Sequence, residues 1–332
     1  MPSKRSIYIF SNGELKRQEN TLWLIGEDGK KAVPVETVDD LNVFGEVTLN
    51  KRLLEFLTKC HIPIHFFNHY DYYIGSYYPR EHLNSGLLTL QQASCYLDLS
   101  RRLDLARRFV DGAMSNMLKA LGYYARRGKK IEEQASGISD LRVQATDVGS
   151  IDELLAVEGN ARRLYYAAWN AIIDNEAFAF AGRVRRPPSN PINALISFGN
   201  SILYVKALSA IYQTQLDPRI GYLHTTNQRA FSLNLDLAEI FKPILVDRVI
   251  FELVNHRRLS RSDFGMELDG CYLTEAGRKT FLEAFEEKLA TTIQHRTLRR
   301  KVSNRELIRL ECYKLYRHLI GEDPYRPYMA LW

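Results

Sequence analysis

The chain has few cysteines, and they are widely separated. Its 332 residues contain Cys60, Cys95, Cys271 and Cys312. A disulfide framework or a structural zinc site needs a denser pattern, such as C-x-x-C. We therefore expect reduced thiols that are mostly buried.

Long apolar runs are lacking as well. No stretch reaches the roughly 18 apolar residues of a membrane-spanning helix, and residues 1–10 lack the apolar core of a secretory signal. The patterns G-x-x-x-x-G-K-[ST], G-x-S-x-G and a strand-linked G-x-G-x-x-G are missing. The sequence thus predicts a cytoplasmic protein without a P-loop, serine-esterase or dinucleotide site.

Hydrophobic residues make up 45% of the chain, enough for a substantial core divided between two domains. Short apolar runs separated by turn signals predict a β-rich region over residues 6–78. Within it, Leu53, Leu54 and Leu57 recur at helical spacing after Asn50, a residue suited to cap a helix. We predict an α+β fold with a small β-rich domain, residues 1–79, before a larger and mostly α-helical domain, residues 80–332.

Helical periodicity dominates the second domain. The predicted helical stretches lie near residues 84–127, 150–176, 191–215, 231–258, 274–297 and 303–320. Two connections between them, residues 183–191 and 217–229, are candidate site loops, because function concentrates in loops held by a rigid scaffold.

The net charge is +6, and the basic surplus lies entirely in the second domain. Residues 1–79 hold 9 of the 45 Lys and Arg and 10 of the 39 Asp and Glu, which leaves 36 basic and 29 acidic side chains after them. Clustered basic residues favour a polyanionic partner, although solvated helix faces are also often basic. The clusters are Arg126, Arg127, Lys129 and Lys130; Arg183, Arg185 and Arg186; Arg257, Arg258 and Arg261; and Arg296, Arg299, Arg300 and Lys301.

Two acids, Asp236 and Glu239, stand three residues apart in the apolar segment 231–243. On a helix they share a face, and two like charges in apolar surroundings need a cation, a metal ion or hydrogen bonds to compensate them. Alternatively, both acids reach solvent or pair with Lys242 and Arg248.

A histidine and a third carboxylate extend this set. His224 lies in the loop that leads into the same predicted helix, and Glu158 follows an apolar run. Each alone is more typical of an ordinary polar or capping residue. Together, carboxylates and one imidazole suit Mn²⁺ or Mg²⁺, and the nearby basic clusters indicate phosphodiester chemistry.

Neighbouring residues are candidates for contacts with DNA. Arg162 and Lys242 are expected to lie behind the ligands or to bind phosphates, and Tyr165 and Tyr166 either position a strand end or belong to the core.

A second histidine pattern does not predict a metal site. His61, His65 and His69 repeat every four residues, which on a helix would align three imidazoles. Pro63 and the apolar run 62–67 indicate a strand instead, on which four residues span roughly 13 Å.

Seven ordered segments resemble the CRISPR-associated endonuclease that serves as the integrase of spacer acquisition, and the likeness runs from about residue 6 to about residue 320. The segments are Val43-Phe-Gly-Glu-Val, Ile62-Pro-Ile-His-Phe-Phe, Gly75-Ser-Tyr-Tyr-Pro-Arg, Val157-Glu-Gly-Asn-Ala-Arg, Asn193-Ala-Leu-Ile-Ser-Phe-Gly-Asn-Ser, Asp217-Pro-Arg-Ile-Gly-Tyr-Leu-His and the segment from Leu233 to Pro243.

The resemblance implies a β domain that forms a symmetric homodimer and a helical catalytic domain with one metal site per subunit. It implies Glu158, His224 and Glu239 as catalytic metal ligands, with Asp236 as a possible fourth, and Mg²⁺ or Mn²⁺ as the cofactor. Many relatives have Glu-Phe-Arg-Pro where this chain has Ile240-Phe-Lys-Pro243, and the lysine is a point charge instead of a two-pronged donor.

These observations predict a metal-dependent DNA endonuclease and integrase that inserts foreign DNA fragments into a CRISPR array. Its expected partners are double-stranded DNA and a small second subunit of the CRISPR adaptation complex. The alternatives are a noncatalytic nucleic-acid scaffold and a metal hydrolase of small phosphoesters. The expected DNA contacts are Arg162, Tyr165, Arg183, Arg185, Arg186 and Lys242.

Overall fold

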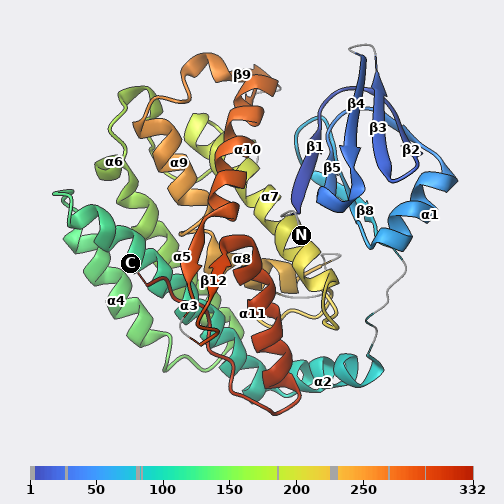
Figure 1. Ribbon diagram of the computed structural model, residues 1–332. Helices are drawn as coiled ribbons and strands as arrows, with labels where there is room; N and C mark the ends of the chain where they lie inside the picture. Colours follow the sequence, from blue (N-terminus) through green and yellow to red (C-terminus); the bar gives the residue numbers. More distant parts are fainter. Residues whose placement is uncertain are drawn as a thin grey trace. The chain divides into compact units, whose positions relative to one another are not determined.

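The computed structural model of the chain describes residues 4–26, 29–79, 83, 85–184, 187–224, 231–267, 270–295 and 297–331. Two compact units, Met1–Asn84 and Ser85–Trp332, make up the chain (Figure 1). The division falls a few residues after the predicted boundary. The first unit is rich in strands and the second in helices, so the predicted α+β class is confirmed.

The first unit is built on two four-stranded sheets. In one, with order β1-β5-β7-β8, β5 runs parallel to both β1 and β7, and β8 is antiparallel to β7. In the other, with order β4-β3-β2-β6, β3 is antiparallel to both neighbours and β6 is parallel to β2. The strands are β1 (Arg5–Ile9), β2 (Gly13–Gln18), β3 (Thr21–Gly26), β4 (Gly29–Pro34), β5 (Val38–Val43), β6 (Val47–Leu49), β7 (Ile64–Phe67) and β8 (Tyr73–Tyr77), with the short 3-10 helix η1 (Val35–Thr37) before β5.

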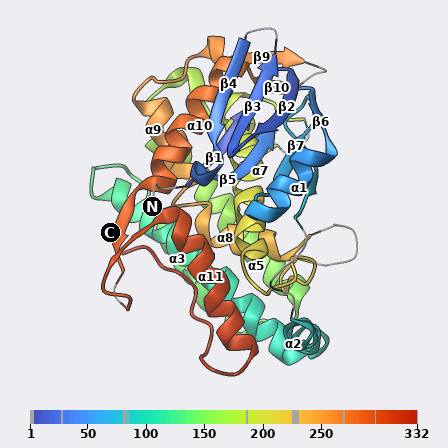
Figure 2. The same cartoon turned by 45° about the vertical axis from the view of Figure 1, so that its right-hand side comes forward.

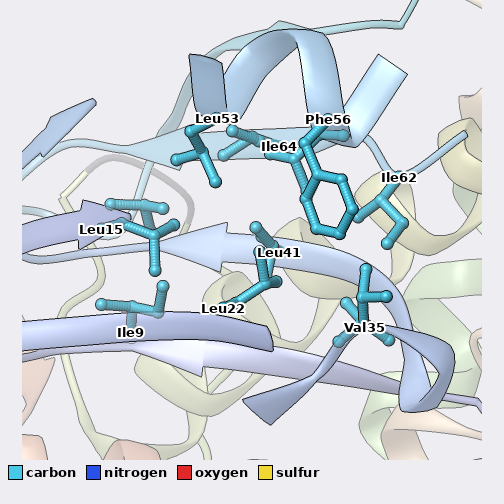
Figure 3. Close-up of a cluster of buried hydrophobic side chains, with 12 residues drawn as sticks. Ile9, Leu15, Leu22, Val35, Leu41, Leu53, Phe56, Ile62 and Ile64 are labelled. Atoms are coloured by element: carbon cyan, nitrogen blue, oxygen red, sulfur yellow. The ribbon is translucent and has the colours of Figure 1, made fainter. Parts of the chain in front are cut away.

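Helix α1 (Lys51–Cys60) begins where the sequence predicts. The Asn50 side chain accepts a hydrogen bond from the Leu53 backbone N–H at 3.0 Å, which satisfies one of the unpaired donors of the first turn. Leu53 and Phe56 point from this helix into the core shared with Ile9 and Leu41 (Figure 3). Their removal from water provides the main stabilisation of this unit.

The residues around His65 form a strand, β7, as predicted. His65 is fully buried and its Nδ1 lies 2.6 Å from the Ser76 hydroxyl on the neighbouring strand. His61 ends helix α1 in the left-handed conformation, so the repeat of histidines does not lie on one helix face.

The second unit is mostly helical (Figures 1 and 2). Its helices are α2 (Gly86–Leu97), α3 (Leu99–Ala125), α4 (Glu132–Gln144), α5 (Ile151–Ala167), α6 (Trp169–Ile172), α7 (Pro191–Tyr212), α8 (Leu233–Phe241), α9 (Val246–Asn255), α10 (Glu275–Ala290) and α11 (Asn304–Leu319), with 3-10 helices η2 (Glu176–Phe178) and η3 (Arg261–Asp263). Two short antiparallel pairs accompany them, β9 (Phe264–Glu267) with β10 (Gly270–Leu273) and β11 (Thr292–Gln294) with β12 (Lys301–Ser303).

The helices differ from the prediction in several places. Asp98 separates α2 from α3, because its side chain caps the start of α3 by accepting from the Arg101 N–H at 3.0 Å. Pro243 lies in the turn between α8 and α9, where its missing N–H ends the helix. Helix α4 was missed, because Ile138 is its one fully buried side chain and the apolar periodicity is weak.

Helix α7 forms the centre of the second unit. It begins with Pro191 at its first position after the cap Asn190. By length and composition it would suffice to cross a membrane, but 83% of its most apolar window is buried in the protein, so it is a core helix. It packs against α8, which also contacts α3 (Figure 2).

The thiols are free, and Cys95, Cys271 and Cys312 are buried, as predicted.

Candidate metal centre

Helix α5 presents a glutamate and an arginine one turn apart on the same face. The helix begins at Ser150, whose hydroxyl accepts from the Glu153 backbone N–H at 3.2 Å. Farther along, Arg162 donates from Nε and Nη2 to Glu158 Oε1 at 3.3 and 3.2 Å. The Glu158 side chain is 18% exposed, so this pair reaches solvent on one side.

Helix α8 supplies the second carboxylate. Glu239 is buried and accepts from Lys242 Nζ on one oxygen and from Arg162 Nη2 on the other. Burial by itself would raise the pKa of Glu239, but the positive charges of Lys242 and Arg162 outweigh it and hold the pKa well below its usual range. Glu239 is therefore an anion at neutral pH even though it is buried.

One nitrogen atom joins the two carboxylates. Arg162 Nη2 bonds to both Glu158 and Glu239, so the two acids converge on a single positive centre. Carboxylate oxygens that converge in this way are the ligands that Mg²⁺ and Mn²⁺ prefer.

The present side-chain conformations pair these acids with cations. Within the described ranges, no three His, Cys, Asp or Glu side chains gather closely enough to hold an ion. Arg162 and Lys242 take up the oxygens that would do so. The donor set fits a divalent ion that displaces Arg162 from the carboxylates.

Asp236 holds the loop that carries His224. Its side chain is 0% exposed and accepts from the backbone N–H groups of Tyr222, Leu223 and His224 at 2.6, 3.1 and 3.0 Å. Its Oδ1 also lies 2.8 Å from His224 Nδ1. Both oxygens are engaged within the protein, and Asp236 orients His224. The possible role of Asp236 as a further metal ligand stays a prediction.

The ring of His224 is prepared for a ligand role. Burial lowers the pKa of His224, but the hydrogen bond and negative charge of Asp236 outweigh it, with help from Glu239, and the pKa lies above its usual value. With Nδ1 held by a carboxylate, Nε2 is the ring atom left to bind a metal ion, as in many metal-binding histidines.

Asp247, in the first turn of α9, is a residue of this site that the sequence interpretation missed. It is almost fully buried, and its backbone N–H donates to the Lys242 carbonyl at 3.0 Å. Burial raises the pKa of Asp247 to about 7, although Arg162 and Lys242 oppose the rise. An acid within the apolar run 244–251 was the signal that could have identified it.

Three of the expected DNA contacts are buried here. Tyr165 is 0% exposed and packs edge to face on Trp169, with ring centroids 6.0 Å apart. The expectation that Tyr165 binds DNA is wrong, because its ring belongs to the core. Arg162 and Lys242 are also buried, and they bind the carboxylates of the site instead of reaching the surface.

The arginine loop is only partly described. Arg183 donates to Asn193 Oδ1 at 3.0 Å and to Ser197 Oγ at 2.9 Å, so it fastens the loop to the start of α7. Arg185 and Arg186 lie outside the described residues, as do residues 225–230 of the loop after His224.

Comparisons with known proteins place these residues in context. The sequence matches the model of one protein family, described as CRISPR associated protein Cas1, over residues 7–287. The CRISPR-associated endonuclease Cas1 2 of Thermodesulfovibrio yellowstonii is 54% identical over 329 residues, which cover 99% of this chain and 100% of that protein. A solved Cas1 protein from Thermotoga maritima has a TM-score of 0.88 at 46% identity and covers 98% of this chain and 99% of its own. A casposase bound to integration product shares the fold, with a TM-score of 0.87 at 20% identity over 97% of this chain and 92% of its own.

Proposed function

Since the chain belongs to the family of the CRISPR associated protein Cas1, we propose that it is a metal-dependent DNA endonuclease and integrase that inserts foreign DNA fragments into a CRISPR array. The convergence of Glu158 and Glu239 on Arg162 Nη2 supports this function most directly. His224, which Asp236 orients and whose pKa the charge of Glu239 helps to raise, would complete a mixed oxygen and nitrogen ligand set.

Glu158, Glu239 and Nε2 of His224 would hold Mg²⁺ or Mn²⁺. Such an ion lowers the pKa of an attacking hydroxyl and stabilises the charge that develops on a phosphate. With a DNA 3′-hydroxyl as the attacking group, the new P–O bond forms as the old one breaks, and the strands are joined. With water as the attacking group, the same exchange nicks the strand.

Two buried cations of the chain, Lys242 and Arg162, have separate roles in the proposed site. Lys242 stays beside Glu239 and balances its charge. Arg162, when it leaves the carboxylates, is a buried guanidinium next to the reaction, suited to bind two oxygens of one phosphate. Asp236 keeps His224 in one orientation and in one tautomer, with the proton on Nδ1.

Partners follow from the same family membership. We expect the first unit to form a homodimer, the second to bind double-stranded DNA through its basic clusters, and a small second adaptation subunit to complete the complex. DNA in a CRISPR array is the expected target, so the protein would act in the cytoplasm.

The sharpest test replaces Glu158. Glu158→Gln removes one ligand charge from a partly exposed residue, so we expect metal-dependent joining of a DNA fragment to fall by at least about 100-fold while salt-sensitive DNA binding remains. Glu239 is a poorer choice, because its loss leaves Lys242 buried without its counter-charge and leaves Arg162 with Glu158 alone, at a cost of about 3–5 kcal/mol.

Asp152→Asn, in the exposed first turn of the same helix, is the matched control and should join DNA normally. Full joining by Glu158→Gln would remove Glu158 from the site. DNA binding by the wild type without joining in any divalent metal would indicate a noncatalytic scaffold. Metal-dependent cleavage of small phosphoesters without action on DNA would indicate the phosphoester hydrolase.

A further inference from the structure

The last turn of α8 lacks local partners for one of its carbonyl groups. Helix ends leave backbone carbonyls without helical N–H donors. At this end the Ile244 N–H donates to Phe241, one residue later than a regular helix would require. The Ile240 carbonyl, directly after Glu239 in the chain, accepts instead from Asn116 Nδ2 of α3 at 2.8 Å.

Asn116 is fully buried, and the rest of its amide bonds to the end of the chain. Nδ2 also donates to the Tyr328 carbonyl at 3.0 Å, and Oδ1 accepts from the Ala330 N–H at 2.8 Å. Both donors and the acceptor are thus used, and only one orientation of the amide satisfies all three groups. Asn116 therefore connects three segments: α3, the end of α8 and residues 325–331, which we call the C-terminal segment.

The C-terminal segment is held along its length although it forms no regular secondary structure. Tyr325 is buried, and its hydroxyl donates to Glu311 Oε1 at 2.6 Å. The Tyr328 ring stacks on Phe241 of α8, with centroids 5.9 Å apart and planes 10° apart. Pro327 lies so close to α3 that a Cβ on Gly112 would come within 2.6 Å of the proline Cβ.

We propose that Asn116 is a positioning residue for the metal centre: it ties the C-terminal segment to the last turn of α8 and so holds Glu239 in place. This inference rests on the proposed function, because it assumes that Glu239 binds the ion. The Ile240 carbonyl is joined to Glu239 by a single peptide unit, so a shift of this carbonyl turns the Glu239 backbone with it. Sites of this kind tolerate displacements of only about 0.5 Å.

The connection works in both directions. If the docked C-terminal segment favours the geometry that binds the ion, the bound ion must favour docking of the segment by the same factor. The Ala330 N–H, which bonds to Asn116, reports on docking through its hydrogen exchange. Mn²⁺ should therefore slow exchange in the C-terminal peptide of the wild type.

The test compares Asn116→Ala with a matched control, Asn304→Ala. Asn304 is also buried, and its Nδ2 likewise donates at 2.8 Å to a carbonyl near a helix end, that of Lys288 in α10. We expect Asn116→Ala to weaken Mn²⁺ binding by about 10-fold, as outer-shell substitutions do, and to abolish the effect of Mn²⁺ on exchange of the C-terminal peptide. Asn304→Ala should keep the Mn²⁺ affinity and the slowing of exchange by Mn²⁺. Calorimetry measures the affinity, and hydrogen-exchange mass spectrometry on the full chain measures the exchange.

Tyr328→Ala is the second variant, because it removes the stack on Phe241 without leaving a buried polar group unpaired. If Asn116→Ala does not fold, Tyr328→Ala tests the inference in its place. We expect it to weaken Mn²⁺ binding severalfold. The inference would be overturned if either variant, Tyr328→Ala or Asn116→Ala, had the Mn²⁺ affinity and the Mn²⁺-dependent exchange of the wild type. Mn²⁺ binding that survives Glu158→Ala would have a different meaning, since it would overturn the proposed metal centre itself.

Discussion

At the scale of single residues, the site is a balance of buried charges. Glu239 stays ionised because Lys242 and Arg162 lie against it, and Asp247 shares the neighbourhood of the same two cations. Asp247 nevertheless has a raised pKa, because burial dominates its surroundings. The two acids lie near the same pair of cations, but their pKa values shift in opposite directions. The cause is that Glu239 contacts both cations directly.

Asp247 makes the stability of the protein depend on pH. Its pKa rises from 3.8 to about 7 on folding, so between these values the folded chain keeps a proton that the unfolded chain has lost. The contribution of this proton to the free energy of unfolding is therefore complete below pH 3.8 and is lost as the pH rises to about 7. Asp247→Asn should remove this fall, which is worth up to about 4 kcal/mol because one pKa unit corresponds to about 1.4 kcal/mol.

Urea unfolding of the metal-free protein at pH 5 and pH 8 measures the effect. Relative to the wild type, the free energy of unfolding of Asp247→Asn should increase from pH 5 to pH 8. Asp140→Asn, at an exposed position of α4, should have the same pH dependence of unfolding as the wild type. A constant difference between Asp247→Asn and the wild type would show that Asp247 titrates normally.

At the scale of elements, the loop before α8 is built around close contacts. Gly221 lies where a Cβ would come within 2.8 Å of the Ser232 carbonyl carbon and 3.0 Å of Asp236 Oδ2. The loop can hold His224 against Asp236 because this position has no side chain. In α5, by contrast, a Cβ on Gly159 would meet nothing within 4 Å.

This pair of glycines gives opposite expectations. Gly221→Ala should destabilise the protein by about 1–3 kcal/mol, the usual cost of overpacking, and weaken Mn²⁺ binding because it pushes Asp236 away from His224. Gly159→Ala should stabilise α5 by about 0.5–1 kcal/mol and leave Mn²⁺ binding unchanged, although it adjoins Glu158. Thermal unfolding and calorimetric Mn²⁺ titration of both variants check this, and equal metal affinity in the two would contradict it.

At the scale of the whole molecule, the two units have different expected tasks. The strand-rich unit has a slight acidic surplus, and the basic surplus lies after it. Phosphate contacts by Lys and Arg release counterions, so binding through them weakens steeply as salt increases. We therefore expect residues 85–332 to carry DNA binding and the strand-rich unit to carry dimer formation.

Removal of residues 1–84 tests both expectations together. Sedimentation should find the full chain as a dimer and residues 85–332 as a monomer, because the predicted dimer surface is absent from the shorter chain. The shorter chain should still bind double-stranded DNA at low salt and lose at least about 10-fold in affinity between 50 and 200 mM salt. A dimer of residues 85–332 would place the interface in the helical unit instead.

The sequence alone determined the order of most elements and predicted most of the residues proposed for the site. Strand and helix periodicity, turn signals and the cap at Asn50 are local properties of the chain, so they predicted the strand-rich unit, α1 and most helices. The ordered family segments predicted Glu158, His224 and Glu239 as ligands before any geometry was known. These features depend on residues that are near one another in the sequence.

Only the tertiary structure decided which partner each side chain meets. Arg162 and Glu239 are 77 positions apart, and Asn116 reaches a residue 214 positions away. The tertiary structure buried Tyr165, one of the expected DNA contacts, and brought Asp236 against His224. A periodic pattern records that a face is apolar but not which element covers it, and a buried polar group takes its role from the partner that satisfies it.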